Sequence, residues 1–256
     1  MRRLRLLAPV VLGLVFALVD APARAASPAG VQPVAADMVR NVQLSTILNV
    51  RDLGGLRGAR GFIPHGRFYR AATLAHASEA DREILLGRGV DLDIDLRTAL
   101  ELLEKPDRLA HDRRFAYRRI SLLGAGLPDW FRSGGLRGLY LHVLDGHQGS
   151  FREVFHAMAT HQRGAILYHC TSGKDRTGLV TAVLLDLAGV ARDAIVRDYA
   201  ISAHYLGRAA TSSPPAAITA FLDALDGKYG GARGYLKHIG VSEPDIESLL
   251  VKLGQA

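Results

Sequence analysis

The stretch HCTSGKDRTG, residues 169–178, joins two apolar runs of different character. The run before it, GAILY, is short and continuous, as in a buried strand, and the run after it, LVTAVLLDLAG, favours a helix that ends at Gly189. A strand that passes through a polar loop into a helix is a building unit of α/β sheets. The stretch therefore predicts an α/β fold, with Cys170, the single cysteine of the chain, at the join.

The rest of the chain continues the alternation of strands and helices. Residues 90–97, VDLDIDLR, alternate apolar and acidic side chains, as a strand does. We expect residues 26–45 to be extended or loosely structured and residues 49–61 to form a Gly-rich loop. Further strands are expected at 67–72, 115–123 and 165–169, and helices at 78–89, 98–105, 135–145, 150–162, 191–206, 216–226, 232–238 and 243–253. This order predicts one α/β domain over residues 26–256, with a central, mostly parallel sheet flanked by helices and a helical C-terminal extension.

The first 25 residues have the pattern of a secretory signal. MRRLR is basic, an apolar stretch follows over residues 6–19, and APARA ends in an Ala23-x-Ala25 pattern. The apolar stretch is shorter than the roughly 18 residues of a membrane-spanning helix, although an uncleaved anchor is the alternative. We therefore expect cleavage after Ala25, export to the periplasm or the medium, and no stable membrane span in the mature chain.

Charge and cysteine content narrow the chemistry. The formal net charge is +7, and removal of residues 1–25 takes away four arginines and one aspartate, which leaves 28 basic and 24 acidic residues and a net charge of +4. This modest surplus suits an anionic substrate, and we predict no nucleic-acid partner. One cysteine cannot form an internal disulfide, so Cys170 is either a buried spectator or a working thiol.

The residues around Cys170 suit a thiolate. The thiolate, and not the thiol, is the nucleophile, and a free cysteine with a pKa of about 8.5 is mostly protonated at neutral pH. The start of a helix favours an anion, and Arg176 lies six positions further along the chain. Such surroundings lower the pKa of a cysteine to about 3.5–7.5.

The same residues can hold a phosphate dianion. Five residues separate Cys170 from Arg176, enough to wrap backbone N–H groups around an oxyanion. Gly173 can supply a backbone angle that other residues resist, and Arg176 can bind two oxygens at once. Thr177 can donate a hydrogen bond to the sulfur, and His169 is placed to brace the loop. The predicted substrate-binding residues are Thr171, Ser172, Gly173, Lys174 and Thr177.

The pattern H-C-x5-R-T resembles the signature of the cysteine-dependent protein tyrosine phosphatase superfamily. The fuller HCTSGKDRTG resembles its bacterial branch of tyrosine/serine and phosphoinositide phosphatases. Four further segments resemble motifs of that branch in the expected order, with Val50 in place of an aromatic residue; they are NVRDLGGL (49–56), FYRAATL (68–74), DIDLRTALE (93–101) and VRDYAIS (196–202). The resemblance covers residues 45–253.

This resemblance implies a phosphatase-like fold and a phosphomonoesterase that works through a cysteinyl-phosphate on Cys170. The implied substrates are phosphotyrosine or phosphoserine proteins, or phosphoinositides, and small phosphate esters are the alternative. A non-catalytic phosphate-binding module is a second function class, and a thiol enzyme such as an arsenate reductase or sulfurtransferase is a third. We expect no cofactor and no metal, since the histidines lack metal-site spacing. The oligomeric state is left open.

The general acid has two candidates. A phosphatase needs an acid to protonate the leaving oxygen. The resemblance implies an aspartate inside the phosphate loop, which is Asp175. Asp129, in the Gly-flanked segment GLPDWFRSGG, is the alternative because it suits a mobile loop. Lys174 either contacts a second phosphate of the substrate or is a solvated lysine or a partner of Asp175.

Four further residues are candidates for supporting roles. Asp52, together with Arg51, either braces the phosphate loop or organises its own turn. Asp95 and Arg97 lie at a strand end, where a structural ion pair is expected. Asp198 is expected to cap or pair within its helix, with an indirect role at the site possible. His169 completes the set.

Overall fold

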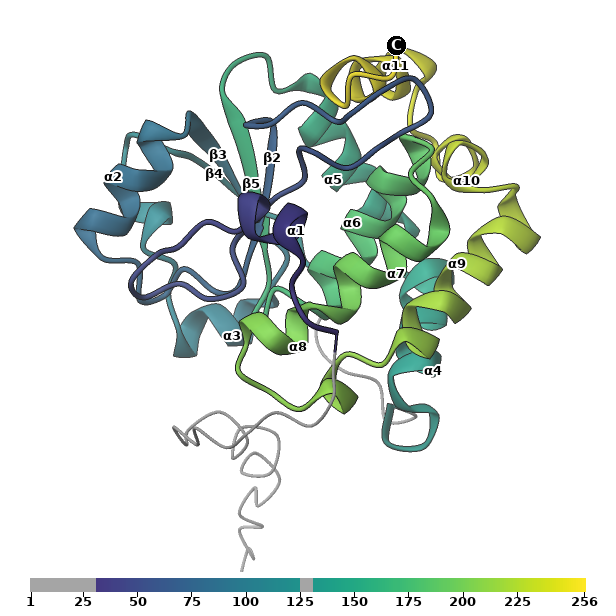
Figure 1. The fold of residues 1–256 in the computed structure, drawn as a ribbon, viewed down its shortest axis with the longest axis horizontal. Coiled ribbons are helices and arrows are strands. Elements are labelled where there is room, and N and C mark those ends of the chain that lie inside the picture. The colour runs from purple at the N-terminus through teal and green to yellow at the C-terminus, as the bar shows by residue number, and fades with distance from the viewer. Residues whose placement is uncertain (1–30, 125–130) are drawn as a thin grey trace, which may run out of the picture.

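The computed structural model describes residues 31–124 and 131–256, which form a sheet between two layers of helices (Figure 1). Within these residues the sheet has five strands in the order β1-β2-β5-β3-β4, and all pairings are parallel except β1 with β2. The strands are β1 (Arg51–Asp52), β2 (Phe68–Ala71), β3 (Val90–Asp95), β4 (Ala116–Arg119) and β5 (Ala165–His169). The mostly parallel sheet confirms the predicted fold class. The predicted signal segment, 1–25, lies outside the described residues.

The helices follow the predicted alternation with the strands. The sheet carries α2 and α3 on one side and most of the other helices on the opposite side (Figure 1). Their bounds are α1 (Ala35–Arg40), α2 (Glu79–Gly87), α3 (Ala99–Glu104), α4 (Phe131–Gly146), α5 (Gln148–Thr160), α6 (Asp175–Leu187), α7 (Arg192–Ala200), α8 (Ser202–Tyr205), α9 (Pro215–Tyr229), α10 (Ala232–His238) and α11 (Glu243–Lys252), with short 3₁₀ turns η1 (Leu109–His111) and η2 (Ala210–Ser212).

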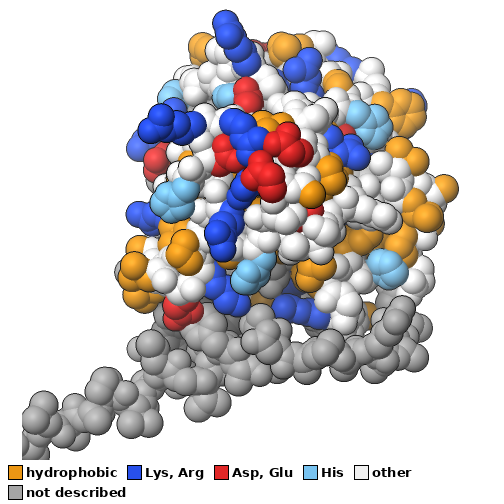
Figure 2. Space-filling model, turned by 90° about the vertical axis from the view of Figure 1, so that its left-hand side faces the viewer, with side chains coloured by type: hydrophobic (Ala, Val, Ile, Leu, Met, Phe, Trp, Pro, Cys, Tyr) orange, Lys and Arg blue, Asp and Glu red, His pale blue; other side chains and the backbone are white. Residues whose placement is uncertain are grey.

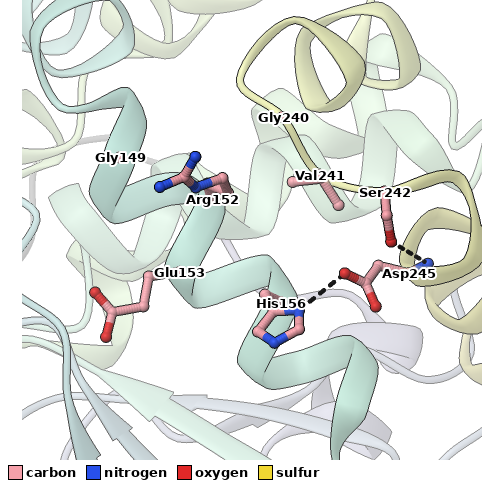
Figure 3. A pocket seen from close by; sticks show the side chains of 8 residues that line it. All are labelled: Gly149, Arg152, Glu153, His156, Gly240, Val241, Ser242 and Asp245. Atoms are coloured by element: carbon pink, nitrogen blue, oxygen red, sulfur yellow. Dashed lines mark hydrogen bonds and ion pairs between the residues drawn. The ribbon is translucent and has the colours of Figure 1, made fainter.

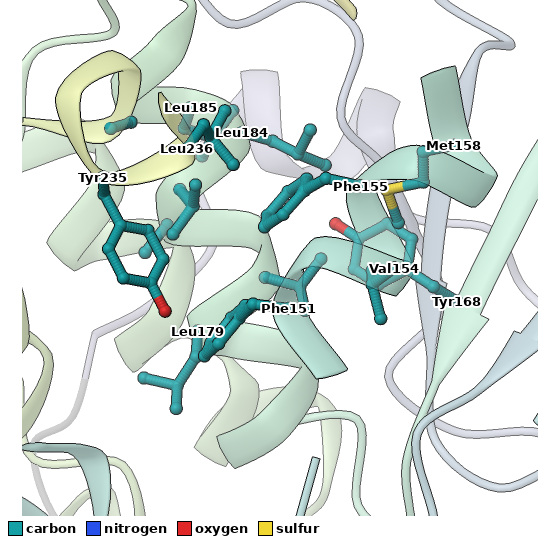
Figure 4. Packing of buried hydrophobic residues seen from close by; sticks show 14 of the residues in the cluster. Phe151, Val154, Phe155, Met158, Tyr168, Leu179, Leu184, Leu185, Tyr235 and Leu236 are labelled. Carbon is teal, nitrogen blue, oxygen red and sulfur yellow. The ribbon is translucent and has the colours of Figure 1, made fainter. Parts of the chain in front are cut away.

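The central strand β5 is buried on both faces, because successive side chains of a strand point to opposite sides. Ile166 and Tyr168 belong to the larger core under α4–α6 and α9–α11, and Leu167 belongs to a smaller core under α2. Figure 4 shows Tyr168 against side chains of α5, with α6 and α10 completing the cluster. The C-terminal helices are therefore part of the main core, since Phe221, Leu236 and Leu249 are fully buried in it.

Two short elements differ from the sequence-based expectation. Residues 26–45 were expected to be extended, but α1 forms within them, and its Asp37 and Arg40 are buried in ion pairs with distant residues. β1 lies in the expected Gly-rich loop and pairs with β2 over two residues. Neither element has a periodic apolar pattern in its sequence. Tertiary ion pairs stabilise α1, and pairing with a neighbouring strand stabilises β1.

The surface over α2 carries an ion-pair network (Figure 2). Arg114 hydrogen-bonds to Glu79, Glu83 and Asp112, and Arg82 also pairs with Glu79 and Asp112. Exposed pairs of this kind contribute little to stability each. No helix in residues 31–124 and 131–256 is long and apolar enough to cross a membrane.

Candidate active site

The stretch 169–178 forms the turn from β5 to α6, at the carboxyl end of the central strand. β5 pairs with β2 on one side and with β3 on the other, so parallel strand ends flank the turn. Ligands of open α/β sheets bind at the carboxyl ends of strands, where helix N-termini favour anions. Residues 170–174 therefore form a loop that leads into the amino end of a 13-residue helix.

The carbonyl groups of the loop are held by donors from other elements. Asn49 donates from Nδ2 to the carbonyls of Ser172 and Gly173, over 3.0 and 3.1 Å. Arg70 donates from Nη2 to the Gly173 carbonyl over 2.8 Å. Within the described residues, the N–H groups of residues 171–174 donate to no protein acceptor. The loop thus has its acceptors occupied and its donors available, as an anion-binding nest requires.

Gly173 is required in this loop for two reasons. Its φ of +62° lies in the left-handed region, which confirms the predicted special backbone angle. A Cβ at this position would also overlap the backbone carbonyl of Ala71 on β2. Any other residue would therefore push the loop away from the sheet.

Cys170 is a buried thiol with a lowered pKa. Its side chain is free of disulfides, and the residue is 2% exposed. Burial alone would raise the pKa, but the positive charge of Arg176 and the side chain and N–H of Thr177 outweigh it and lower the pKa of Cys170 below its usual value. The Thr177 hydroxyl is buried and is engaged by no other group in the described residues. The site therefore favours a thiolate.

Arg176 is bound by the carboxylate of Glu101, which the sequence analysis did not identify as a site residue. Glu101 of α3 binds its Nη1 and Nη2 over 2.7 Å each, and Nη1 also donates to the Leu96 carbonyl over 3.3 Å. Burial disfavours the charged carboxylate, but its bonds from Arg176 and Thr171 lower the pKa of Glu101 to about 2. Because Glu101 holds the end of the guanidinium fork, the Nε edge of Arg176 is the part that remains for an oxyanion.

Lys174 and Asp175 are in contact with each other and with the surrounding helices. Lys174 donates from Nζ to the Ser212 carbonyl and lies 3.5 Å from Asp175 Oδ1. Since Lys174 is 7% exposed, a freely solvated lysine is excluded, and the partnership with Asp175 is present. Asp175 Oδ1 also accepts a hydrogen bond from the hydroxyl of Tyr140 on α4. The alternative general acid, Asp129, lies outside the described residues.

His169 is fully buried in a cluster of acidic residues behind the loop. Its Nε2 lies 3.2 Å from Asp107 and 3.4 Å from Asp93, and Nδ1 lies 3.3 Å from the Cys170 carbonyl. Burial opposes the charge of His169, but the carboxylates of Asp95, Asp93 and Asp107 raise its pKa to about 10. His169 is therefore an imidazolium that braces the loop from behind.

The acidic cluster behind the loop has the interatomic distances of a metal site, but its side chains do not have the charges that a metal site requires. One ligand atom each of Asp93, Asp107 and His169 lies within 4.8 Å of the others. An imidazolium has no lone pair to offer a metal, and burial raises the pKa of Asp93. Arg97, 3.1 Å from Asp107, supplies a second positive charge. We interpret the cluster as ion pairs.

Asp95 makes the structural ion pair with Arg97 that its position suggested. Arg97 donates from Nη2 to Asp95 over 2.7 Å and from Nη1 to the Thr73 hydroxyl over 2.9 Å. Thr73 in turn donates from its backbone N–H to the carbonyl of Thr171 over 3.1 Å. The pair thus braces the phosphate loop through Thr73.

Asp198 is more widely connected than predicted. It does not pair within its own helix; it lies 2.5 Å from Arg40 and from Arg70 and 3.6 Å from Arg51. Burial disfavours its charge, but the three arginines outweigh it and lower the pKa of Asp198. Asp198 therefore orients Arg70, which holds the loop at Gly173.

Asp52 organises its own turn, which is the second of the two roles expected for it, and makes no hydrogen bond to the phosphate loop among the described residues. It accepts hydrogen bonds from the N–H of Gly54 over 2.8 Å and of Gly66 over 2.9 Å, and it lies 3.1 Å from His65 Nδ1. All of these groups belong to the connection between β1 and β2. Asp52 thus organises that turn, and its neighbour Arg51 supports the loop by hydrogen-bonding to Asn49.

Sequence reasoning missed five side chains at this site. Asn49, Arg70, Glu101 and Tyr199 lie within the quoted motif segments, but nothing local shows which group each one contacts. Glu101 has one further signal, the Thr98-x-x-Glu101 spacing of a helix capping box, which the structure contains. Tyr140 has no such signal.

A second hollow lies away from the phosphate loop, between α5 and the start of α11 (Figure 3). His156 of α5 lies 2.9 Å from Asp245 of α11, and Ser242 caps that helix by accepting from the Asp245 N–H over 3.2 Å. The His156–Asp245 pair thus bridges the hollow. None of the predicted site residues lines it.

Comparisons with known proteins agree with this geometry. A family model described as the tyrosine phosphatase family matches residues 42–254. A tyrosine-protein phosphatase of Nostoc commune is 45% identical over 224 residues, 76% of each chain. A candidate tyrosine-protein phosphatase of Cupriavidus necator is 36% identical over 170 residues, 62% of each chain. The triple specificity protein phosphatase PtpB of Mycobacterium tuberculosis is 30% identical over 115 residues, 33% of this chain and 42% of that protein.

Proposed function

We propose that this chain, which belongs to the tyrosine phosphatase family, hydrolyses phosphate monoesters in two steps. The two steps are linked by a cysteinyl-phosphate intermediate on Cys170. The observation that carries this proposal is the conjunction of a lowered Cys170 pKa with a loop whose N–H donors meet no acceptor among the described residues. Both features stabilise negative charge at the same place, the thiolate before the reaction and the phosphate during it.

In the first step the phosphate dianion occupies the loop, held by the N–H groups of residues 171–174 and the Nε edge of Arg176. The Cys170 thiolate attacks phosphorus, an S–P bond forms, and the bond from phosphorus to the ester oxygen breaks. The leaving oxygen carries away the bonding pair and takes a proton from Asp175, which becomes a carboxylate.

In the second step water attacks the phosphorus of cysteinyl-phosphate and gives its proton to the Asp175 carboxylate. The S–P bond breaks, inorganic phosphate leaves, and the electron pair returns to the Cys170 sulfur. The buried Thr177 hydroxyl can donate to that sulfur and so ease its departure. The cycle restores the thiolate and the acid.

We propose proteins phosphorylated on tyrosine or serine as the first substrate class. Lys174 supports this preference, because its ammonium group is held by the Ser212 carbonyl and Asp175. A phosphoinositide with a second phosphate would have to displace that carbonyl. Phosphoinositides are the second candidate, since Lys174 is a cation beside the loop, and the mycobacterial relative is described as a triple specificity enzyme.

A substrate panel tests the proposal. Phosphotyrosine and phosphoserine peptides, phosphoinositides and small phosphate esters are compared by kcat/KM with the wild type, Cys170→Ser and Lys174→Met. We expect vanadate-sensitive turnover that is lost in Cys170→Ser, with the phosphopeptides preferred and little changed in Lys174→Met. Phosphate binding without turnover would support the non-catalytic module instead. A preference for phosphoinositides that Lys174→Met removes would reverse the order of substrates.

A further inference from the structure

Two buried tyrosines extend the site beyond the phosphate loop. The hydroxyl of Tyr140, on α4, donates to Asp175 Oδ1, and the hydroxyl of Tyr199, on α7, lies 2.7 Å from that of Tyr140. Tyr140 is 0% exposed and Tyr199 is 1% exposed. Their rings meet edge to face with centroids 6.0 Å apart. Buried hydroxyls with these partners are held in one geometry by the packing of two helices.

The direction of the hydrogen bonds follows from the number of protons. A phenol has one proton, and Oδ1 of Asp175 accepts whether the side chain is a carboxylate or carries its proton on Oδ2. Tyr140 therefore donates to Asp175, and Tyr199 donates to the oxygen of Tyr140. Burial and then the nearby charge of Asp175 raise the pKa of both phenols above the usual value, so both remain donors at neutral pH.

The two oxygens of Asp175 are not equivalent. Oδ1 accepts from Tyr140 and lies 3.5 Å from Lys174 Nζ. Oδ2 has no hydrogen-bond or ion-pair partner among the described residues. The side chain of Asp175 is 27% exposed, whereas the two phenols are buried, so Oδ2 is the oxygen left for an incoming ester.

We propose that Tyr140, supported by Tyr199, is a positioning residue that fixes Oδ1 of Asp175 and so directs Oδ2 to the leaving oxygen. This inference rests on the proposed function, with Asp175 as the general acid. The transferred proton leaves Oδ2, and the phenol protons stay in place. As Asp175 becomes a carboxylate, its bond from Tyr140 becomes charge-assisted and stronger. The contact thus stabilises the transition state more than the bound substrate, which raises kcat and leaves KM nearly unchanged.

The dependence of the rate on the leaving group separates this role from a structural one. An ester whose alcohol is a good leaving group needs little help from an acid, and one whose alcohol is a poor leaving group needs much. Tyr140→Phe removes the hydroxyl and keeps the ring. For a poor leaving group we expect kcat to fall by roughly 10- to 100-fold, the range of one charge-assisted hydrogen bond. For a good leaving group we expect less than about a 3-fold fall, with KM within about 2-fold for both esters.

Two further variants serve as comparison and control. Tyr199→Phe should show the same selectivity with a smaller loss, because it acts through Tyr140. Tyr168→Phe removes another buried phenol, whose hydroxyl lies 2.7 Å from Thr181 in the core, and should show no selectivity for the leaving group.

The outcomes keep this inference apart from the proposed function. A wild type without turnover on either ester rejects the proposed function, and this inference with it. An active wild type together with equal losses on both esters in Tyr140→Phe, or with no loss, rejects the role of Tyr140 alone. A selective loss in Asp129→Asn that is absent from Asp175→Asn also overturns it, because the acid would then be elsewhere.

Discussion

At the scale of single residues, the sulfur of Cys170 is stabilised as an anion by a small number of charges. Burial would raise the pKa of this thiol, and the positive charge of Arg176 together with the side chain and N–H of Thr177 outweighs that effect. Glu101 holds Arg176 in place by a two-point bond. Cys170 is the single cysteine of the chain, so a spectroscopic signal from a thiolate can be assigned to it without ambiguity.

We predict that the ultraviolet absorbance of the thiolate appears at a pH below the ordinary cysteine pKa of about 8.5. The signal is the difference between the wild type and Cys170→Ser as pH is raised. In Arg176→Ala the midpoint should move to higher pH, because the largest stabilising charge is gone. Arg208→Ala is the control, since Arg208 contacts the loop rim at Ser172 over 3.4 Å. A wild-type midpoint at or above about 8.5 would contradict the electrostatic argument.

Residues with a local signal could be predicted from the sequence, and those defined by distant partners could not. Gly173 needed a positive φ inside a short loop, and the structure shows it. By contrast, Glu101 lies 75 positions from Arg176, and Asn49 lies 124 positions from Gly173. No periodicity or spacing encodes such a contact, because the fold alone brings the two groups together.

At the scale of elements, the site is a loop stretched between β5 and α6 and fastened to the neighbouring strands. Arg70 of β2 binds its carbonyl at Gly173, and Thr73, just after β2, binds its carbonyl at Thr171. The loop therefore lies close against β2. That closeness leaves no room for a side chain at position 173.

We predict that Gly173→Ala disables the loop. The new Cβ would meet the Ala71 carbonyl at a strained φ, so the loop must shift. We expect kcat/KM to fall by about 100-fold or more, since a displacement of about 1 Å is enough for that. We also expect a loss of roughly 1–3 kcal/mol in the free energy of unfolding by denaturant.

Gly149→Ala is the matched control for this substitution. Gly149 lies in α5, where a Cβ would meet nothing within 4 Å and φ is not positive. The free energy of unfolding of Gly149→Ala should be unchanged or rise by up to about 1 kcal/mol. We expect this variant to have full activity. If Gly173→Ala and Gly149→Ala had the same kcat/KM and the same free energy of unfolding, the loop would tolerate displacement.

Long elements with a clear apolar pattern were predicted more reliably than short ones. The strand at 90–97 appears as β3, and the helix after the phosphate loop appears as α6. The strand expected at 115–123 is shorter, because β4 spans only residues 116–119 at the edge of the sheet. α1 was missed because buried ion pairs of Asp37 and Arg40 stabilise it, and these are tertiary contacts.

At the scale of the whole molecule, two buried charge clusters of opposite character support the loop. Behind His169 lie the carboxyl groups of Asp93, Asp95 and Asp107, and beside Gly173 lie Arg40, Arg51 and Arg70 around Asp198. These three arginines outnumber the two carboxylates that they pair with, Asp198 and Asp37, so this cluster adds positive potential near the phosphate site. The fold thus uses buried ion pairs as well as apolar packing to place the loop.

We predict that His169 stabilises the fold in a pH-dependent way. Its pKa is raised from 6.5 to about 10 in the folded chain, so the folded state binds this proton more tightly than the unfolded state. The contribution is therefore full below pH 6.5 and is lost as pH rises through about 10. At low pH, His169→Gln should cost about 3–5 kcal/mol, the usual range for breaking a buried ion pair.

The measurement is the difference in free energy of unfolding between the wild type and His169→Gln across this pH range. The difference should shrink steadily from pH 6.5 to about 10. The exposed His76 provides the control, and His76→Gln should give only a small difference. A difference for His169→Gln that is constant with pH would show that the imidazolium is not the stabilising form.

Rapid acid quenching tests whether Cys170 carries the phosphoryl group during turnover. A phosphate ester is mixed with excess enzyme, the reaction is stopped within one turnover, and the peptide that contains residues 169–178 is analysed by mass spectrometry. We expect one phosphoryl group on Cys170 in the wild type, and none in Cys170→Ser. Ester hydrolysis at the full rate with no phosphoryl group on that peptide at any quench time would contradict this expectation.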